Sequence, residues 1–84
     1  MPVFDELEFH PRFEEHQRDG GRRVVTEAEA IEAWYGRRTI VRNRKRRGRY
    51  LLLGTAWGRD IVVVLLQTRK PHVWQAYTAW DTDP

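Results

Sequence analysis

Apolar and polar residues follow a helical spacing in the first part of the chain and a strand-like spacing in the rest. Residues 12–19 fit a short polar helix that His10-Pro11 opens and Gly20-Gly21 ends. Thr26-Glu27-Ala28-Glu29 is a capping box, in which Thr26 and Glu29 bond each other's backbone, and it predicts a second helix that ends at Gly36.

Four β-rich runs follow the second helix, at residues 37–44, 50–57, 60–68 and 73–80. Short turn-like segments separate them, so we expect neighbouring strands to be antiparallel. Residues 3–9 also have the pattern of a short edge strand. The predicted fold is α+β, with two N-terminal helices packed on one face of a four-stranded antiparallel β-meander.

The chain is expected to be a single domain whose first and second parts differ in charge. Its 84 residues suit a single domain with an acidic helical part (1–36), a basic sheet (37–80) and a tail (81–84). Residues 1–36 hold four Arg against nine Asp or Glu, a net charge of −5. Residues 37–84 hold eleven Lys or Arg against three Asp, a net charge of +8, which predicts a polyanionic partner.

Several classes of protein are excluded at this stage. The chain has no cysteine, so disulfides and cysteine-ligated zinc are excluded. It has no apolar run of membrane-spanning length and no signal-peptide pattern, so we expect a cytoplasmic protein without a membrane partner.

Turn lengths and strand alternation predict which side chains share a face of the sheet. The face under the helices should hold Thr39, Val41, Leu52, Gly54, Ala56, Ile61, Val63, Leu65, Trp74, Ala76 and Trp80. The opposite face should be open and basic, with Arg38, Arg42, Arg44, Arg49, Thr55, Thr68, Gln75 and Tyr77 around an apolar row of Ile40, Leu53 and Val64.

The open face predicts two kinds of contact. Residues 42–49 contain six basic side chains, mostly Arg, which suits phosphate binding. The predicted RNA-binding set is Arg38, Arg42, Arg44, Lys45, Arg46, Arg47 and Gln75. The same run also fits a solvated hairpin tip or a dock for an acidic protein. The apolar row Ile40, Leu53 and Val64 predicts docking of a partner helix or of a second copy, a homodimer.

Candidate catalytic groups are few. His10 and His16 are six residues apart, so they do not share a helix face as a metal pair would, and we expect no metal and no cofactor. His16 is the best-placed histidine for general acid or base catalysis. Cleavage of RNA by its own 2′-hydroxyl needs only positioning, proton transfer and cations around the phosphate. Arg can supply the cations, and His, Tyr, Glu or Lys the proton transfer.

Four short motifs carry a resemblance to a known family. They are Phe9-His10-Pro11, Val25-Thr26-Glu27-Ala28-Glu29-Ala30, Arg49-Tyr50-Leu51-Leu52-Leu53-Gly54, and the closing Tyr77-Thr78-Ala79-Trp80. Together with Ile61-Val62-Val63-Val64 and the order of elements, they resemble the BrnT-like branch of the RelE/ParE superfamily. These are toxins of bacterial type II toxin–antitoxin modules.

The resemblance implies an endoribonuclease that acts without metal on mRNA, at the ribosome, inhibits translation and is neutralised by an acidic antitoxin. It places catalytic roles on Arg49 and Thr78, and the family's sheet-borne basic and tyrosine residues fall on Arg42, Arg49 and Tyr77. Trp80 stands where the family pattern has Arg, so no role is carried over to that position. The alternatives are a non-catalytic nucleic-acid-binding module and a protein-interaction module on the same fold.

Overall fold

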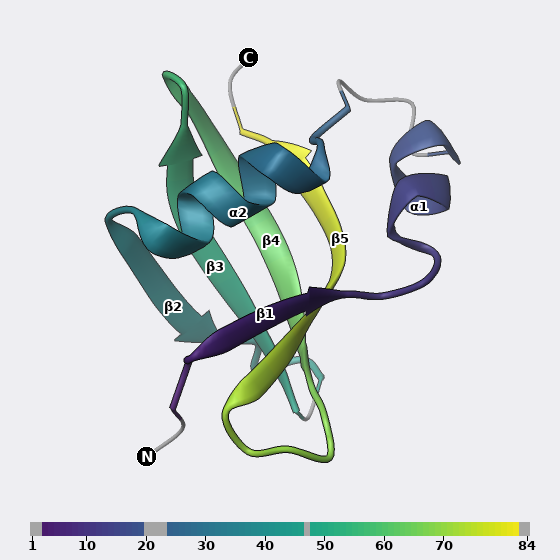
Figure 1. The fold of residues 1–84 in the computed structure, drawn as a ribbon, viewed down its shortest axis with the longest axis vertical. Coiled ribbons are helices and arrows are strands. Elements are labelled where there is room, and N and C mark those ends of the chain that lie inside the picture. Colours follow the sequence, from purple (N-terminus) through teal and green to yellow (C-terminus); the bar gives the residue numbers. More distant parts are fainter. Residues whose placement is uncertain (1–2, 20–23, 47, 83–84) are drawn as a thin grey trace.

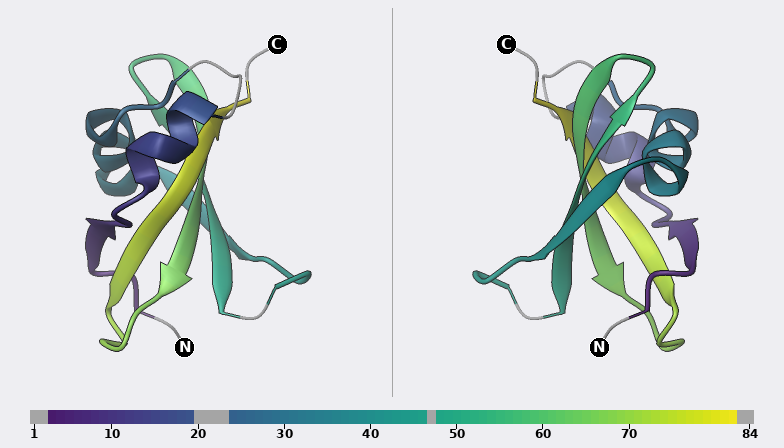
Figure 2. Two further views of the ribbon diagram at one scale, coloured as in Figure 1. Left: turned by 90° about the vertical axis from the view of Figure 1, so that its right-hand side faces the viewer. Right: turned by 90° about the vertical axis from the view of Figure 1, so that its left-hand side faces the viewer.

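A single mixed sheet organises the part of the chain that the computed structural model describes, residues 3–19, 24–46 and 48–82. Its strands are β1 (Glu6–Phe9), β2 (Arg38–Arg42), β3 (Arg49–Ala56), β4 (Arg59–Gln67) and β5 (Val73–Asp81), in the order β1-β5-β4-β3-β2. The helix α2 (Glu27–Tyr35) covers one face of the sheet, and α1 (Phe13–Asp19) lies beside β5 (Figures 1 and 2).

The predicted four-stranded antiparallel meander behind two N-terminal helices is wrong. A fifth strand, β1, precedes both helices and pairs in parallel with β5. The backbone amide of Glu6 donates to His72 and that of His10 donates to Ala76, which fixes β1 along the edge. Apolar side chains of this segment pack against the core, and the ring of Phe4 stacks 4.5 Å from that of Trp74. The strand pattern at residues 3–9 is therefore real.

The second helix forms as predicted. Thr26 accepts from the amide of Glu29 at 3.1 Å and Glu29 accepts from the amide of Thr26, so both halves of the capping box are present. Gly36 ends the helix. Ala33 lies so close to β3 that a Cβ at Gly54 would be 3.1 Å from its side chain. Gly54 therefore allows the helix to approach the sheet.

Arg59 ties three elements together at the end of the sheet near the start of α2. Its guanidinium donates to Asp81 on β5 at 2.8 Å and to Glu29 on α2. The hydrogen bond to Asp81 raises the pKa of Arg59 above its already high ordinary value, although burial opposes the shift. Because this pKa is raised, the guanidinium of Arg59 stays charged throughout the pH range in which proteins are handled. The sequence analysis did not find this cluster.

The two central strands present the faces that alternation predicted. Leu52 and Ala56 on β3, and Ile61, Val63 and Leu65 on β4, are buried under α2. The β3–β4 turn is Trp57-Gly58 instead of Gly58-Arg59, but the two registers differ by an even number of residues, so the faces are unchanged. We call the sheet face away from α2 the open face.

The predicted faces of β2 and of Trp80 are wrong. Arg42 pairs with Tyr50 and Ile40 with Leu52. The same register sets Asn43 opposite Arg49, whose carbonyl accepts from the Asn43 amide, so five residues, 44–48, close the hairpin instead of the predicted four. Thr39 and Val41 therefore lie on the open face, and Arg38, Ile40 and Arg42 lie on the helix side. In β5 the register shifts between Ala76 and Thr78, so Trp80 pairs with Val62 on the open face.

Candidate functional site

Tyr77 is the centre of a group of aromatic and cationic side chains drawn from four parts of the chain. We call Arg49, Tyr77, His10 and His16 the Tyr77 cluster. The guanidinium carbon of Arg49 is 5.3 Å from the centroid of the Tyr77 ring. The ring of His16 is 4.5 Å from that of Tyr77, and the ring of His10 is 5.1 Å from it. Three of the four predicted catalytic residues are thus brought together.

A β-bulge gives Tyr77 its position. Leu65 pairs with Ala76 and Val64 with Thr78, so Tyr77 is the extra residue in β5. A bulge re-aims the side chain it carries and is common beside functional sites. Here it presents the ring of Tyr77 to Arg49 from β3 and to both histidines beside the edge of β5.

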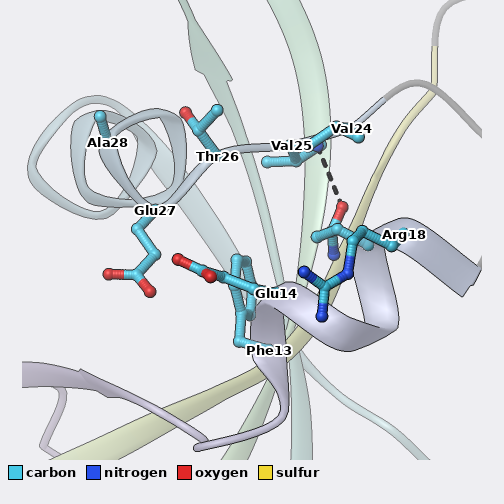
Figure 3. A pocket seen from close by; sticks show the side chains of 9 residues that line it. Phe13, Glu14, Arg18, Val24, Val25, Thr26, Glu27 and Ala28 are labelled. Carbon is cyan, nitrogen blue, oxygen red and sulfur yellow. Dashed lines mark hydrogen bonds between the residues drawn. The ribbon is translucent and has the colours of Figure 1, made fainter.

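Gln17 fixes α1, and with it His16, against β5. The Gln17 side-chain amide donates to the carbonyl of Ala79 at 3.0 Å and lies 3.5 Å from Oγ1 of Thr78. Its oxygen accepts from the amide of Val25 at 3.0 Å, the dashed line in Figure 3. Gln17 is only 7% exposed, so these bonds are shielded from water. Thr78, the fourth predicted catalytic residue, therefore contacts Gln17 and is next to Tyr77 in β5.

The histidines differ in what they offer a substrate. Nδ1 of His10 accepts from the backbone amide of Arg12 at 3.1 Å, which requires that this nitrogen carry no proton. Nε2 of His16 is buried, with no hydrogen-bond partner in the ranges 3–19, 24–46 and 48–82. A buried nitrogen does not meet a substrate directly. The partly exposed side chains of Arg49, Tyr77 and His10 are the ones a ligand can reach.

Local turn chemistry shapes the basic loop between β2 and β3. Oδ1 of Asn43 accepts from the amide of Lys45 at 3.1 Å, and Gly48 has a φ of 72°, so an Asx turn and a left-handed glycine shape it. We call Arg44, Lys45 and Arg46, which are all exposed, the hairpin tip. The β2–β3 hairpin projects away from the helices (Figure 2). Arg47 lies outside the described residues.

Two other members of the predicted RNA-binding set are placed differently. Arg38 donates to the carbonyl of Trp34 at 2.8 Å and to that of Phe4 at 3.0 Å, and it stacks 4.3 Å over the Trp34 ring. It caps the end of α2 and is not available for phosphate. Arg42 is exposed but lies on the helix side of the sheet. Gln75 is on the open face, paired with Leu66, as alternation predicted.

The predicted apolar partner row does not form as a row. Ile40 packs against the core, whereas Leu53 and Val64 lie on the open face. Leu53 is 40% exposed and Val64 only 7%. The open face has other apolar members that were predicted on the helix side, chiefly Val41, because of the β2 register, and Trp80, because of the shift in β5.

A pocket of about 420 Å³ lies between α1 and the start of α2 (Figure 3). Phe13, Val24, Val25 and Ala28 make it largely apolar, and its charged lining residues are Glu14, Glu27 and Arg18. Two carboxylates against one guanidinium do not favour a phosphate. The pocket is therefore a poor candidate for the polyanion site, and the Tyr77 cluster with the hairpin tip is the better one.

Comparison of the chain with protein-family models, with curated proteins and with solved structures gave no match. The resemblance to the toxin superfamily therefore rests on the short motifs alone. Neither described helix has the length and apolar composition that crossing a membrane requires.

Proposed function

We propose that this protein binds RNA and cleaves it without metal, as the toxin component of a bacterial type II toxin–antitoxin module acting on mRNA. The observation that carries the proposal is the stacking of Arg49 on Tyr77 at 5.3 Å, beside two histidine rings. A cation next to a proton-carrying phenol is the minimum that cleavage by the 2′-hydroxyl requires.

In the proposed reaction the 2′-oxygen of a ribose attacks the adjacent phosphorus and the 5′-oxygen of the next nucleotide leaves. A water accepts the 2′-hydroxyl proton, the hydroxyl of Tyr77 supplies a proton to the leaving oxygen, and solvent restores the phenol. Arg49 compensates the charge on the pentavalent phosphate. The products are a 2′,3′-cyclic phosphate and a 5′-hydroxyl. His16 and Gln17 act by holding the Tyr77 ring and are positioning residues.

The hairpin tip supports a path for the rest of the RNA. Arg44, Lys45 and Arg46 are exposed, and the strand that follows them in the chain, β3, begins at Arg49. Arginine binds phosphate bidentately, and each phosphate neutralised contributes to a salt-dependent affinity. In this proposal an acidic antitoxin would compete with RNA for the same basic side chains.

Induction in a bacterial host and incubation of purified protein with mRNA in EDTA test the proposal. We expect growth arrest and RNA fragments that end in cyclic phosphate, both lost in Arg49→Ala and Tyr77→Phe. Tyr35→Phe is the matched control, because Tyr35 is 78% exposed on α2, away from the cluster. Tight RNA binding without fragments would leave a non-catalytic binding module. Absence of both binding and cleavage would refute the proposal.

A second function, protein interaction, is favoured by one specific observation. The open face exposes 40% of Leu53 on β3 and 38% of Val41 on the neighbouring edge strand β2. Large apolar side chains gathered on a sheet face are typical of a docking surface.

A further inference from the structure

The central strand β4 is apolar on both of its faces. Ile61, Val63 and Leu65 pack under α2, while Val62, Val64 and Leu66 alternate with them on the open face. An antiparallel strand with one face in water usually alternates apolar with polar residues, and a continuous apolar run is typical of a strand covered on both sides. In the described part of the chain neither helix covers the open face (Figure 2).

The charges on this face do not favour an acidic partner. The basic side chains of the second half lie mostly elsewhere: at the hairpin tip, on the helix side (Arg38 and Arg42), or in the ion pairs of Arg59. Across β2, β3 and β4 the described open-face positions carry one cation, Arg49, and one anion, Asp60. These two charges lie at opposite ends of the apolar centre formed by Leu51, Leu53, Val62 and Val64.

This distribution is self-complementary. Consider two copies placed open face to open face and related by a twofold axis that runs across the strands, parallel to that face. This axis reverses the strand direction of the second copy, so its Arg49 end lies on the Thr55–Asp60 end of the first. The apolar centres then meet, and each Arg49 lies opposite an Asp60. A hollow of about 540 Å³ at this end is lined by Asp60, Thr55 and Leu53, and also by Arg37 and Arg38. Because Arg38 is already bonded to the carbonyls of Trp34 and Phe4, Asp60 is the anion in this hollow that the facing Arg49 would meet.

We propose that the open face is covered by a second copy of this chain, in a face-to-face dimer with Arg49 of each copy against Asp60 of the other. Two sheets that pack in this way interdigitate their inner side chains about 10 Å apart. Val62 and Val64 are already only 7% exposed in the single chain, so the side chains that the dimer newly covers are chiefly Leu53 and, on the edge strand β2, Val41.

The size of the face sets the strength of the dimer. Four strands at about 4.8 Å spacing and about seven residues at 3.3 Å rise give a patch of roughly 450 Å² per copy. Stable complexes bury about 800 Å² per partner, so this dimer is reversible and dissociates on dilution.

One consequence rests on the proposed function. Arg49 would be used both by the dimer interface and by bound RNA, so RNA and the second copy exclude each other. The dimer is then the form without activity, and RNA releases the monomer.

Sedimentation velocity over a wide range of protein concentrations, without RNA, tests the dimer itself. We expect a monomer–dimer equilibrium that Leu53→Asp weakens by at least about tenfold, because an unpaired carboxylate would be buried. Ile31→Asp on α2 is the matched control, since Ile31 is 42% exposed and Leu53 40%, and it should dimerise as the wild type does. Monomers at every concentration, or equal loss in both variants, would overturn the proposal.

A charge swap tests the arrangement of the two copies and does not depend on the folding of Leu53→Asp. Arg49→Asp alone should weaken the dimer, and Arg49→Asp combined with Asp60→Arg should restore it. If the double variant is as weak as the single one, the proposed twofold is wrong.

Addition of a single-stranded RNA oligonucleotide to the dimer tests the exclusion. Conversion of dimer to RNA-bound monomer is expected. RNA bound to an intact dimer would refute the exclusion and leave the dimer standing. Absence of any RNA binding would refute the proposed function, while the dimer is judged from the sedimentation without RNA.

Discussion

Arg49 and Tyr77 meet across an intervening strand. They belong to β3 and β5, which do not pair with each other, yet the guanidinium carbon is 5.3 Å from the ring centroid. The contact brings a cation and a phenol together at the Arg49 end of the open face. Most of the proposed function depends on this pair.

Replacement of Arg49 by Gln should change how RNA binding responds to salt. If Arg49 contacts a phosphate, the slope of log affinity against log salt for single-stranded RNA falls by about 0.7. Arg38→Gln is the comparison, because Arg38 bonds the carbonyls of Trp34 and Phe4. It should lower stability and leave the slope unchanged. Equal slopes for wild type and Arg49→Gln would exclude the phosphate contact.

Removal of Arg59 should be the most damaging change of a charged side chain in the fold. Arg59→Met leaves the carboxylates of Glu29 and Asp81 without this partner, and their side chains are only 10% and 4% exposed. Breaking a buried pair from one side costs about 3 kcal/mol of the free energy of unfolding. Urea denaturation measures it. Arg37→Met at an exposed position should change the value by less than about 0.5 kcal/mol, and a similar loss in both variants would argue against the cluster.

Trp57 should be replaceable with a gain in stability. It is 67% exposed and has a φ of 48°, followed by Gly58 at 83°, a pair of left-handed residues typical of a type I′ turn. Asn tolerates this conformation, so Trp57→Asn should raise the melting temperature by about 5 °C, on an assumed relief of about 1 kcal/mol. Trp57→Ala keeps the steric cost and should show no such gain. Equal melting temperatures for the two variants would count against backbone strain.

Acid should remove the contribution of one surface ion pair. A hydrogen bond from Arg12, and the charge of the same guanidinium, lower the pKa of Glu15 below its ordinary value of 4.5. The folded state therefore favours the ionised carboxylate, and the stabilisation is present above that value and is lost as the pH falls through the lowered pKa. Thermal denaturation should separate wild type from Glu15→Gln slightly at pH 6 and not at pH 2. A difference that persists in acid would contradict this assignment.

The sequence predicted what local chemistry determines. The capping box of Thr26 and Glu29 lies within four residues, so α2 was predictable from end to end. The faces of β3 and β4 followed from alternation between strands joined by a two-residue turn. The face of β2 was missed by one residue, although Asn43 and Gly48 carry the turn chemistry that marks the longer loop.

Other features depend on contacts between distant residues. The bulge at Tyr77 has no sequence signature, and it moved Trp80 to the opposite face from the one predicted. The parallel pairing of β1 with β5 joins the two ends of the described chain and could not be read from either segment. The candidate site was found in part: Arg49, Tyr77 and His16 were named from the sequence, whereas Gln17 was not.

Gln17 also ties the assembly of the Tyr77 cluster to the order of protein synthesis. Gln17 bonds Thr78 and Ala79, which lie 61 and 62 residues further along the chain. The strand β1 likewise pairs with β5, which is synthesised late. A nascent chain emerges from the ribosome N-terminus first, and contacts of such separation form only when the distant segment is available. While β5 is still inside the ribosome, His10 and His16 cannot pack against Tyr77. The proposed nuclease would thus be inert until β5 has left the ribosome.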